Sequence, residues 1–279
     1  MNLMISTFLL TAAAAPAVWS TPPVSSDQFE AYAAFDPWSG DLWFVRAKPD
    51  FTGWRIKVSR CSGRGWLEPV DMPFSGDGVE ADPWFTPDGR TMWFISTRST
   101  DGVRKKDLDI WRAKRTRDGR WSSVERLPEP INSPGQEWFP RLTADGWLYF
   151  GSSRPGGFGK TDIWRARQRR DGGWRIENAG PAVNSAGDEY EPLPSPDGRS
   201  LLIGTADGYY RSTWSRVGWT KRVKLGPEIN ANGSETGATL SPSGRSWMFG
   251  RDLKDGRSGE LLLVAGAEHG PPRCKRANR

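Results

Sequence analysis

Histidine is almost absent from this sequence. Its 279 residues include one histidine, His269, near the C-terminal end. Ser-His-Asp and Cys-His catalysis need an imidazole beside the nucleophile, and many metal sites use several imidazoles. The body of the chain therefore lacks the residues for either kind of site. Carboxylate pairs remain as the available acid–base chemistry.

Long hydrophobic runs are also scarce. The one such stretch, Met4–Ala17, is uncharged and ends in the small-x-small sequence Ala15-Pro16-Ala17. This pattern predicts a signal peptide over residues 1–17 and a mature start near Val18, the alternative being a buried strand. No other segment reaches the ~20 apolar residues of a membrane-spanning helix. We therefore expect a periplasmic or secreted protein with no transmembrane segment after cleavage.

Amphipathic helical patterns are missing, whereas turn formers and tryptophan are abundant. The chain contains 32 Gly, 22 Pro and 16 Trp. Short apolar runs alternate with Gly, Pro, Asn and Asp clusters, which is typical of strands joined by turns. The sequence therefore predicts an all-β protein.

An internal repeat indicates which all-β architecture the chain adopts. A segment that begins with Glu and continues to a Pro-Asp-Gly or similar turn occurs five times, at intervals of 50, 57, 52 and 46 residues. The copies start at Glu30, Glu80, Glu137, Glu189 and Glu235. Repeats of this length indicate a ring or solenoid of equivalent units.

Each unit has the pattern of four antiparallel strands. In the third unit, a strand leads to the turn at Asp145-Gly146, Trp147–Ser152 follows, Asp162-Ile-Trp-Arg forms a third strand, and Trp174 opens a fourth. Four such strands make one blade of a β-propeller. We expect one five-bladed propeller over residues 18–272, followed by a basic tail at 273–279. A six-bladed ring is the alternative, although residues 1–28 are too few for another blade.

The repeat resembles a known family. The combination Glu-x-x-Pro, Pro-Asp-Gly, "SSRPGGFGKTDIWR" and "GPAVNSAGDEYEP" is similar to the PD40 (WD40-like, TolB-type) propeller repeat, especially the version in bacterial envelope proteins that also carry an OmpA-like domain. The resemblance covers residues 29–265 and implies a propeller that serves as a binding scaffold. The OmpA-like domain is missing, so peptidoglycan anchoring is not implied.

The ends of the chain are expected to meet in the last blade. That repeat shows three strands, Gly237–Leu240, Ser246–Phe249 and Glu260–Val264, and the N-terminal segment Trp19–Val24 is a candidate for the fourth. A three-stranded final blade is the alternative. In a closed ring Cys61 and Cys274 lie on neighbouring blades, so they are candidates for a disulfide, the alternative being two independent thiols.

Charged residues recur at one rim of the predicted ring. The first strand of each blade starts there with its glutamate, the second strand ends there, and the third begins there. The charges expected at this rim, beside Glu30, Glu80, Glu137, Glu189 and Glu235, are Lys48, Arg98, Arg154, Arg251, Asp109, Asp162 and Glu260. They could form a funnel that binds a polar ligand. We favour instead a network of charge-assisted hydrogen bonds between blades, because catalytic groups seldom repeat in every unit.

Residues that break the repeat are better candidates for ligand contact. Trp84, Trp138 and Tyr190, with Tyr209 and Tyr210, differ between blades and are expected to line a groove. No loop has the ligand spacing of a calcium-binding hand, and no cofactor or metal is expected. An enzyme remains the alternative, in the form of a glycoside hydrolase that uses carboxylates of the central funnel.

The chain carries a formal net charge of +6, spread along its length. Such a surface attracts anionic partners without sequence preference. No nucleic-acid motif is present and export removes that partner. We therefore expect a monomeric, non-catalytic binding module for an envelope protein or an anionic cell-wall polymer.

Overall fold

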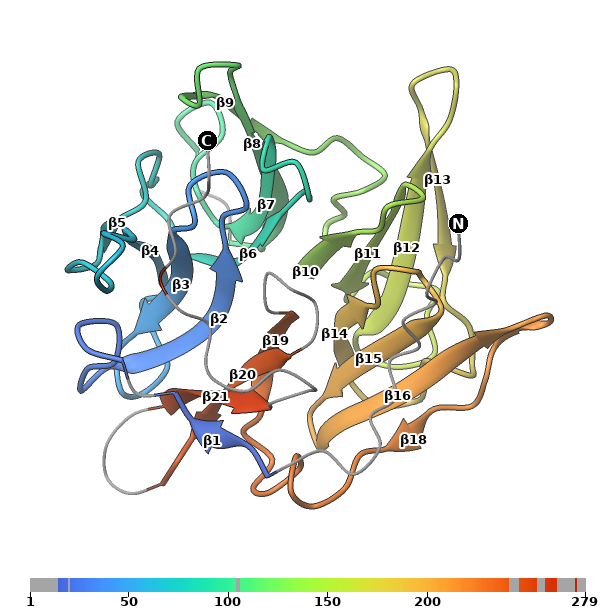
Figure 1. The fold of residues 1–279 in the computed structure, drawn as a ribbon. Coiled ribbons are helices and arrows are strands. Elements are labelled where there is room, and N and C mark those ends of the chain that lie inside the picture. Colours follow the sequence, from blue (N-terminus) through green and yellow to red (C-terminus); the bar gives the residue numbers. More distant parts are fainter. Residues whose placement is uncertain are drawn as a thin grey trace, which may run out of the picture.

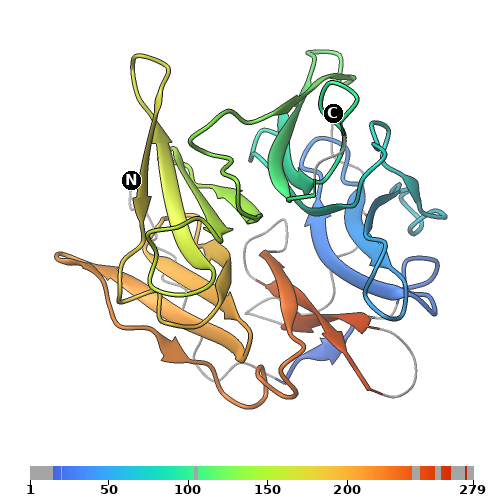
Figure 2. The ribbon, with the colours of Figure 1, turned by 180° about the vertical axis from the view of Figure 1, so that it is seen from behind.

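Five antiparallel sheets surround a common centre in the computed structural model (Figures 1 and 2). The structure describes residues 15–19, 21–103, 106–240, 246–254, 259–264 and 274. Each sheet has a path of four strands, so the predicted five-bladed propeller is confirmed and the six-bladed alternative is wrong. Most of the predicted signal segment, His269 and the tail around Cys274 lie outside the described residues.

Blades one to three each follow chain order from the inner to the outer strand. Blade one comprises β2 (Phe29–Phe35), β3 (Leu42–Ala47), β4 (Arg55–Ser59) and β5 (Val70–Asp71). Blade two comprises β6 (Glu80–Phe85), β7 (Thr91–Ser96), β8 (Asp109–Arg115) and β9 (Trp121–Arg126). Blade three comprises β10 (Glu137–Leu142), β11 (Trp147–Ser152), β12 (Asp162–Gln168) and β13 (Trp174–Asn178).

Blades four and five depart from this plan at their outer strands. Blade four comprises β14 (Glu189–Pro194), β15 (Ser200–Thr205), β16 (Gly208–Ser215) and β17 (Gly218–Trp219), and β18 (Val223–Lys224) also pairs with β16. Blade five comprises β19 (Thr236–Leu240), β20 (Trp247–Asp252), β21 (Gly259–Val264) and, outermost, the N-terminal β1 (Ala17–Val18).

The N-terminal segment closes the ring, but two residues earlier than the sequence suggested. Ala17 pairs with Leu263 and Val18 with Leu262, and the Trp19 amide donates to the Leu261 carbonyl at 2.8 Å. The segment after Trp19 turns away instead of pairing. β1 thus includes Ala17, the last residue of the predicted signal segment.

Turn chemistry explains why the inner hairpins recur. In blade three the Thr143 hydroxyl donates to Asp145 at 2.6 Å and accepts from the Trp147 amide at 3.0 Å, while Gly146 has φ +88°. A positive φ is accessible to glycine without strain, and the short Asp side chain satisfies the turn. The same arrangement is present at Thr86–Gly89 and Ser195–Gly198.

Aromatic side chains fill the space between blades. Trp43 of β3, 2% exposed, lies edge-on to Phe85 at 5.4 Å and to Trp121 at 5.7 Å, both from blade two. Burying rings of this size on both faces of each sheet is the main stabilising contribution to a propeller. Most of the tryptophans are therefore packing residues, which leaves few for ligand contact.

A buried asparagine joins consecutive blades. Asn132, in the loop that leads into blade three, accepts from the Ile110 amide at 2.7 Å and donates to the carbonyls of Ile110 and Leu127 at 3.0 and 2.8 Å. Its amide therefore extends the third strand of the preceding blade as a peptide group would. Asn184 and Asn230 make the same pair of bonds to the third strand, at Ile163 and Tyr209, one and two blades later.

The two cysteines are joined. Cys61, which follows β4, forms a disulfide with Cys274, 213 residues further along the chain. The bond ties the C-terminal part of the chain to blade one. Within the described part of the chain, no helix has the length and apolarity required to span a bilayer.

Candidate functional site

The five repeated glutamates lie at one rim, and each is bonded to its own blade and to the loop that enters it. The Glu137 carboxylate, whose side chain is fully buried, accepts from the Ser133 hydroxyl at 2.6 Å, the Ser152 hydroxyl at 2.9 Å and Arg154 at 3.2 Å. Burial raises the pKa of Glu137, and these hydrogen bonds oppose that rise. Glu30, Glu80, Glu189 and Glu235 are likewise buried, bonded to the preceding loop and paired with an arginine.

The paired arginines hold the loop that enters each blade. Arg154 donates to the carbonyls of Pro130 at 2.8 Å and Ile131 at 2.5 Å, as well as to its glutamate. Arg98 and Arg251 act in the same way. Two positions differ from the sequence prediction, because Arg46 rather than Lys48 pairs with Glu30, and Arg222 pairs with Glu189.

The aspartates predicted at this rim are also bonded locally. Asp109 binds Arg126 through both oxygens, at 2.5 and 2.7 Å. Asp162 accepts from the amides of Phe158 and Gly159 and from Asn178. The partners lie within the same blade or in the loop that precedes it. The rim charges therefore form a structural network with no free carboxylate pair at Glu137, Asp109 or Asp162.

A cavity of about 520 Å³ opens at this same mouth of the ring, and we call it the axial funnel. Its walls are mainly aromatic, with acidic and hydroxyl groups between the rings. Among the residues that the structure describes, the lining contains no lysine or arginine. It consists of Phe29, Tyr32, Phe51, Trp54, Trp138, Phe139, Thr161, Asp188, Tyr190, Ala206, Gly233, Ser234, Glu235, Thr236 and Asp252.

Only two of the five aromatic residues predicted to line a groove lie in the funnel. Trp138 and Tyr190 do so. Trp84 lies at the opposite mouth, in an apolar cavity of about 200 Å³ that also includes Phe85 and Leu240. The difference follows from strand position, since Trp84 stands four residues after its glutamate and Trp138 one residue after.

Beneath the funnel lie three buried charged residues, Asp82, Arg141 and Glu191, which we call the axial cluster. The Asp82 carboxylate accepts from the Phe139 amide of the next blade at 2.8 Å. Glu191 accepts from the amides of Gly237 at 2.9 Å and Ala238, also in the next blade. The Arg141 guanidinium lies 4.9 Å from the Trp84 ring.

Desolvation dominates the electrostatics of the axial cluster. Burial raises the pKa of Asp82 to about 7 and that of Glu191 to about 7, with Arg141 opposing both shifts. The Tyr209 hydroxyl donates to Glu191 at 3.1 Å. Asp82 Oδ1 and Arg141 Nε have no hydrogen-bond partner among the described residues. Groups perturbed in this way occur both at functional sites and in structural networks.

The axial cluster was not among the sequence predictions, although a signal for two of its members, Asp82 and Glu191, was present. The inner strands contain a bulge beginning two residues or fewer after the glutamate. The residue two positions after each glutamate sits at this bulge and differs in every blade. It is Tyr32, Asp82, Phe139, Glu191 or Gly237. Variation at one position of a strict repeat is the pattern expected of residues at the centre of the ring.

No group of three His, Cys, Asp or Glu side chains suited to a metal ion is present in the residues that the structure describes. Asp82 and Glu191 are each bonded to amides of their neighbouring blade, which satisfies part of their acceptor capacity. The described residues therefore form the axial funnel with the buried axial cluster beneath it.

Comparison with known proteins supports the fold alone. No family model matches the sequence, and no curated protein matches it. A glucose dehydrogenase is similar in structure with a TM-score of 0.51 and 14% identity, over 90% of this chain and 100% of that one. The α-L-arabinanase of Penicillium chrysogenum, complexed with arabinobiose, has a TM-score of 0.51 and 12% identity, over 91% and 98%. A putative TolB from Agrobacterium tumefaciens has a TM-score of 0.39 and 20% identity, over 80% and 62%.

Proposed function

We propose that the protein is an exported, non-catalytic binding module that takes a segment of an envelope polymer into the axial funnel. The observation that carries this proposal is the lining of the funnel, where blades one, three and four contribute aromatic rings around hydroxyl and carboxylate groups. Ligand sites typically combine an apolar wall with a few convergent polar groups.

The lining also favours one class of polymer. Aromatic faces attract cations and pack against apolar faces, and carboxylates accept hydrogen bonds from hydroxyl and amino groups. Asp188 and Asp252 stand among these rings, and the one basic partner of Asp188 among the described residues, Lys160 at 3.7 Å, lies outside the lining. A glycan with hydroxyl or amino groups suits this funnel better than the anionic polymer suggested by the net charge.

Export is part of the proposal. A disulfide such as Cys61–Cys274 is stable in an oxidising compartment and rare in the cytosol. The signal-like segment and the PD40-type repeat agree with a periplasmic or secreted protein.

Binding can be measured through the tryptophan fluorescence of the pure protein, since Trp54 and Trp138 line the funnel. We expect glucosamine oligomers to change the emission saturably and polygalacturonate to leave it unchanged. Trp138→Ala and Asp188→Asn should each weaken binding about tenfold, because each removes one wall group worth roughly 1.4 kcal/mol. Trp214→Ala, outside the funnel, is the matched control. Unchanged affinity in both funnel variants would overturn the proposal.

A glycan-acting enzyme is the second candidate, and the observation in its favour is the axial cluster. Glycoside hydrolases use two carboxyl groups, one of them with a raised pKa. Asp82 and Glu191 have such pKa values but are completely buried beneath the funnel. Hydrolysis of a glycan by the pure protein, lost in Glu191→Gln without unfolding, would establish the enzyme and reject the binding module.

A further inference from the structure

Blade four departs from the repeat at one arginine of its third strand, Arg211. In blade two Arg112 lies opposite Glu125 and pairs with it, and in blade three Arg165 lies opposite Glu177 at 2.7 Å. In blade four the register places Val223, 68% exposed, opposite Arg211. No side-chain hydrogen bond or ion pair joins Arg211 to any residue that the structure describes.

The residue opposite Arg211 on the second strand also differs from its equivalents in blades two and three. On the second strand Trp93 lies opposite Arg112, and its ring is 5.8 Å from the guanidinium. Tyr149 lies opposite Arg165 and accepts a hydrogen bond from it at 3.2 Å. In blade four the corresponding residue is Leu202, which has no ring. Arg211 therefore lacks both the carboxylate and the ring that its equivalents contact.

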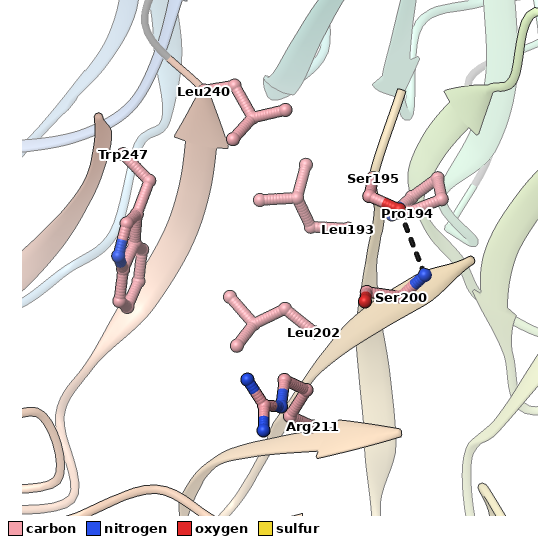
Figure 3. Close-up of a pocket in the computed structure, with 8 residues that line it drawn as sticks. All are labelled: Leu193, Pro194, Ser195, Ser200, Leu202, Arg211, Leu240 and Trp247. Atoms are coloured by element: carbon pink, nitrogen blue, oxygen red, sulfur yellow. Dashed lines mark hydrogen bonds between the residues drawn. The ribbon is translucent and has the colours of Figure 1, made fainter. Parts of the chain in front are cut away.

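A cavity of about 40 Å³ lies where the ring is missing (Figure 3). Leu193 and Leu202 point across it toward Trp247 of blade five, and Arg211 lies at its edge (Figure 3). Leu193 and Trp247 are each only 5% exposed, so the walls are rigidly packed. Ser195 and Ser200, joined by a hydrogen bond of 2.9 Å, form the polar side.

We propose that this cavity binds a carboxylate carried on a compact apolar body. Guanidinium pairs with carboxylate through parallel hydrogen bonds, and an apolar group gains by leaving water for a leucine-lined wall. The ligand would supply in trans the carboxylate that blade four lacks relative to blades two and three, and its apolar body would fill the space left by the missing ring. Because Ser195, Pro194 and Leu240 also line the opposite mouth, this site is separate from the axial funnel.

Two sources present this chemistry, a free branched-chain acid and the C-terminal residue of a peptide. The probes are 4-methylpentanoate and an acetylated tripeptide that ends in leucine, each compared with its amide. Binding is followed by NMR of the leucine methyl groups, which reports on Leu193, Leu202 and Leu240 directly. We expect saturable shifts at these methyls with the acids and none with the amides. Tighter binding of the peptide acid would identify a peptide terminus, and tighter binding of the free acid a small molecule.

Two variants and two controls make the test specific. Arg211→Gln should weaken binding of the acids at least tenfold, and Val223→Glu should do the same by giving Arg211 the partner found in blades two and three. Arg112→Gln, which alters the equivalent arginine of blade two, should leave the affinity unchanged, as should Trp138→Ala in the funnel. Equal binding of acid and amide, or unchanged affinity in both Arg211→Gln and Val223→Glu, would overturn the proposal.

Discussion

Two opposed effects act on the pKa of Asp82 and of Glu191 at the centre of the ring. Each carboxylate accepts backbone hydrogen bonds from the next blade, which favours the ionised form, while complete burial favours the neutral form. Burial prevails, and the pKa of each group rises to about 7. A protonated carboxyl still accepts through its carbonyl oxygen. Asp82 can therefore keep its one contact to the next blade, whereas Glu191, whose two oxygens accept from Gly237 and Ala238, keeps one of its two in this way.

The raised pKa values predict that stability decreases as the solution becomes more alkaline. In the unfolded chain these carboxyls ionise near pH 4, as model peptides do, whereas in the folded protein they keep their protons to about pH 7. The contribution of this pair to stability is therefore complete below about pH 4 and is lost as the pH rises through 7.

This dependence can be measured by chemical denaturation between pH 5 and pH 8. We expect the free energy of unfolding to decrease over this range, and the decrease to be smaller in Glu191→Gln, which cannot ionise. Glu125→Gln, at an exposed ion pair, is the control for general charge effects. An identical slope in Glu191→Gln and the natural protein would contradict the assignment.

At the scale of the element, the repeat was sufficient to place most strands. β11 coincides with the range Trp147–Ser152 that the pattern predicted. The closing strand was misplaced by two residues, because a two-residue strand has no periodicity of its own and its position depends on pairing with β21. The bulges were missed for a related reason, since the φ of a residue such as Tyr32 is set by its neighbours in the ring and not by its own preference.

The bulge of β19 provides a test of how tightly the inner strands meet. Gly237 has φ +72°, and a Cβ atom there would lie 2.0 Å from Cδ1 of Tyr32 in blade one. Gly237→Ala should therefore lower the free energy of unfolding by about 3 kcal/mol, from backbone strain together with overpacking. Gly146→Ala, with φ +88° and no atom within 4 Å of the added Cβ, should show the strain alone, about 1 kcal/mol. Equal effects in the two variants, measured by denaturation, would mean that the Tyr32 ring moves aside without a measurable cost in free energy.

At the scale of the whole molecule, the disulfide constrains nearly the entire chain. Cys61 and Cys274 are separated by 213 residues, and closing a loop of that length removes conformational entropy from the unfolded state worth up to about 5 kcal/mol. Replacing both cysteines by serine should lower the free energy of unfolding by an amount that approaches this limit. Denaturation of the natural protein with and without dithiothreitol is the matched comparison. If the double variant unfolds at the same denaturant concentration as the oxidised protein, the bond contributes nothing to stability.

Blade five has a consequence for the order in which this protein can be assembled. Its outermost strand, β1, comes from residues 17 and 18, whereas the strand that it pairs with, β21, spans residues 259–264. A chain that emerges from the ribosome or a translocon from its N-terminus presents the first of these partners nearly 250 residues before the second. Blades one to four can pair their strands as they emerge, because every ladder in them is local. The final blade must wait until β21 has emerged, and until then β1 has no sheet to join.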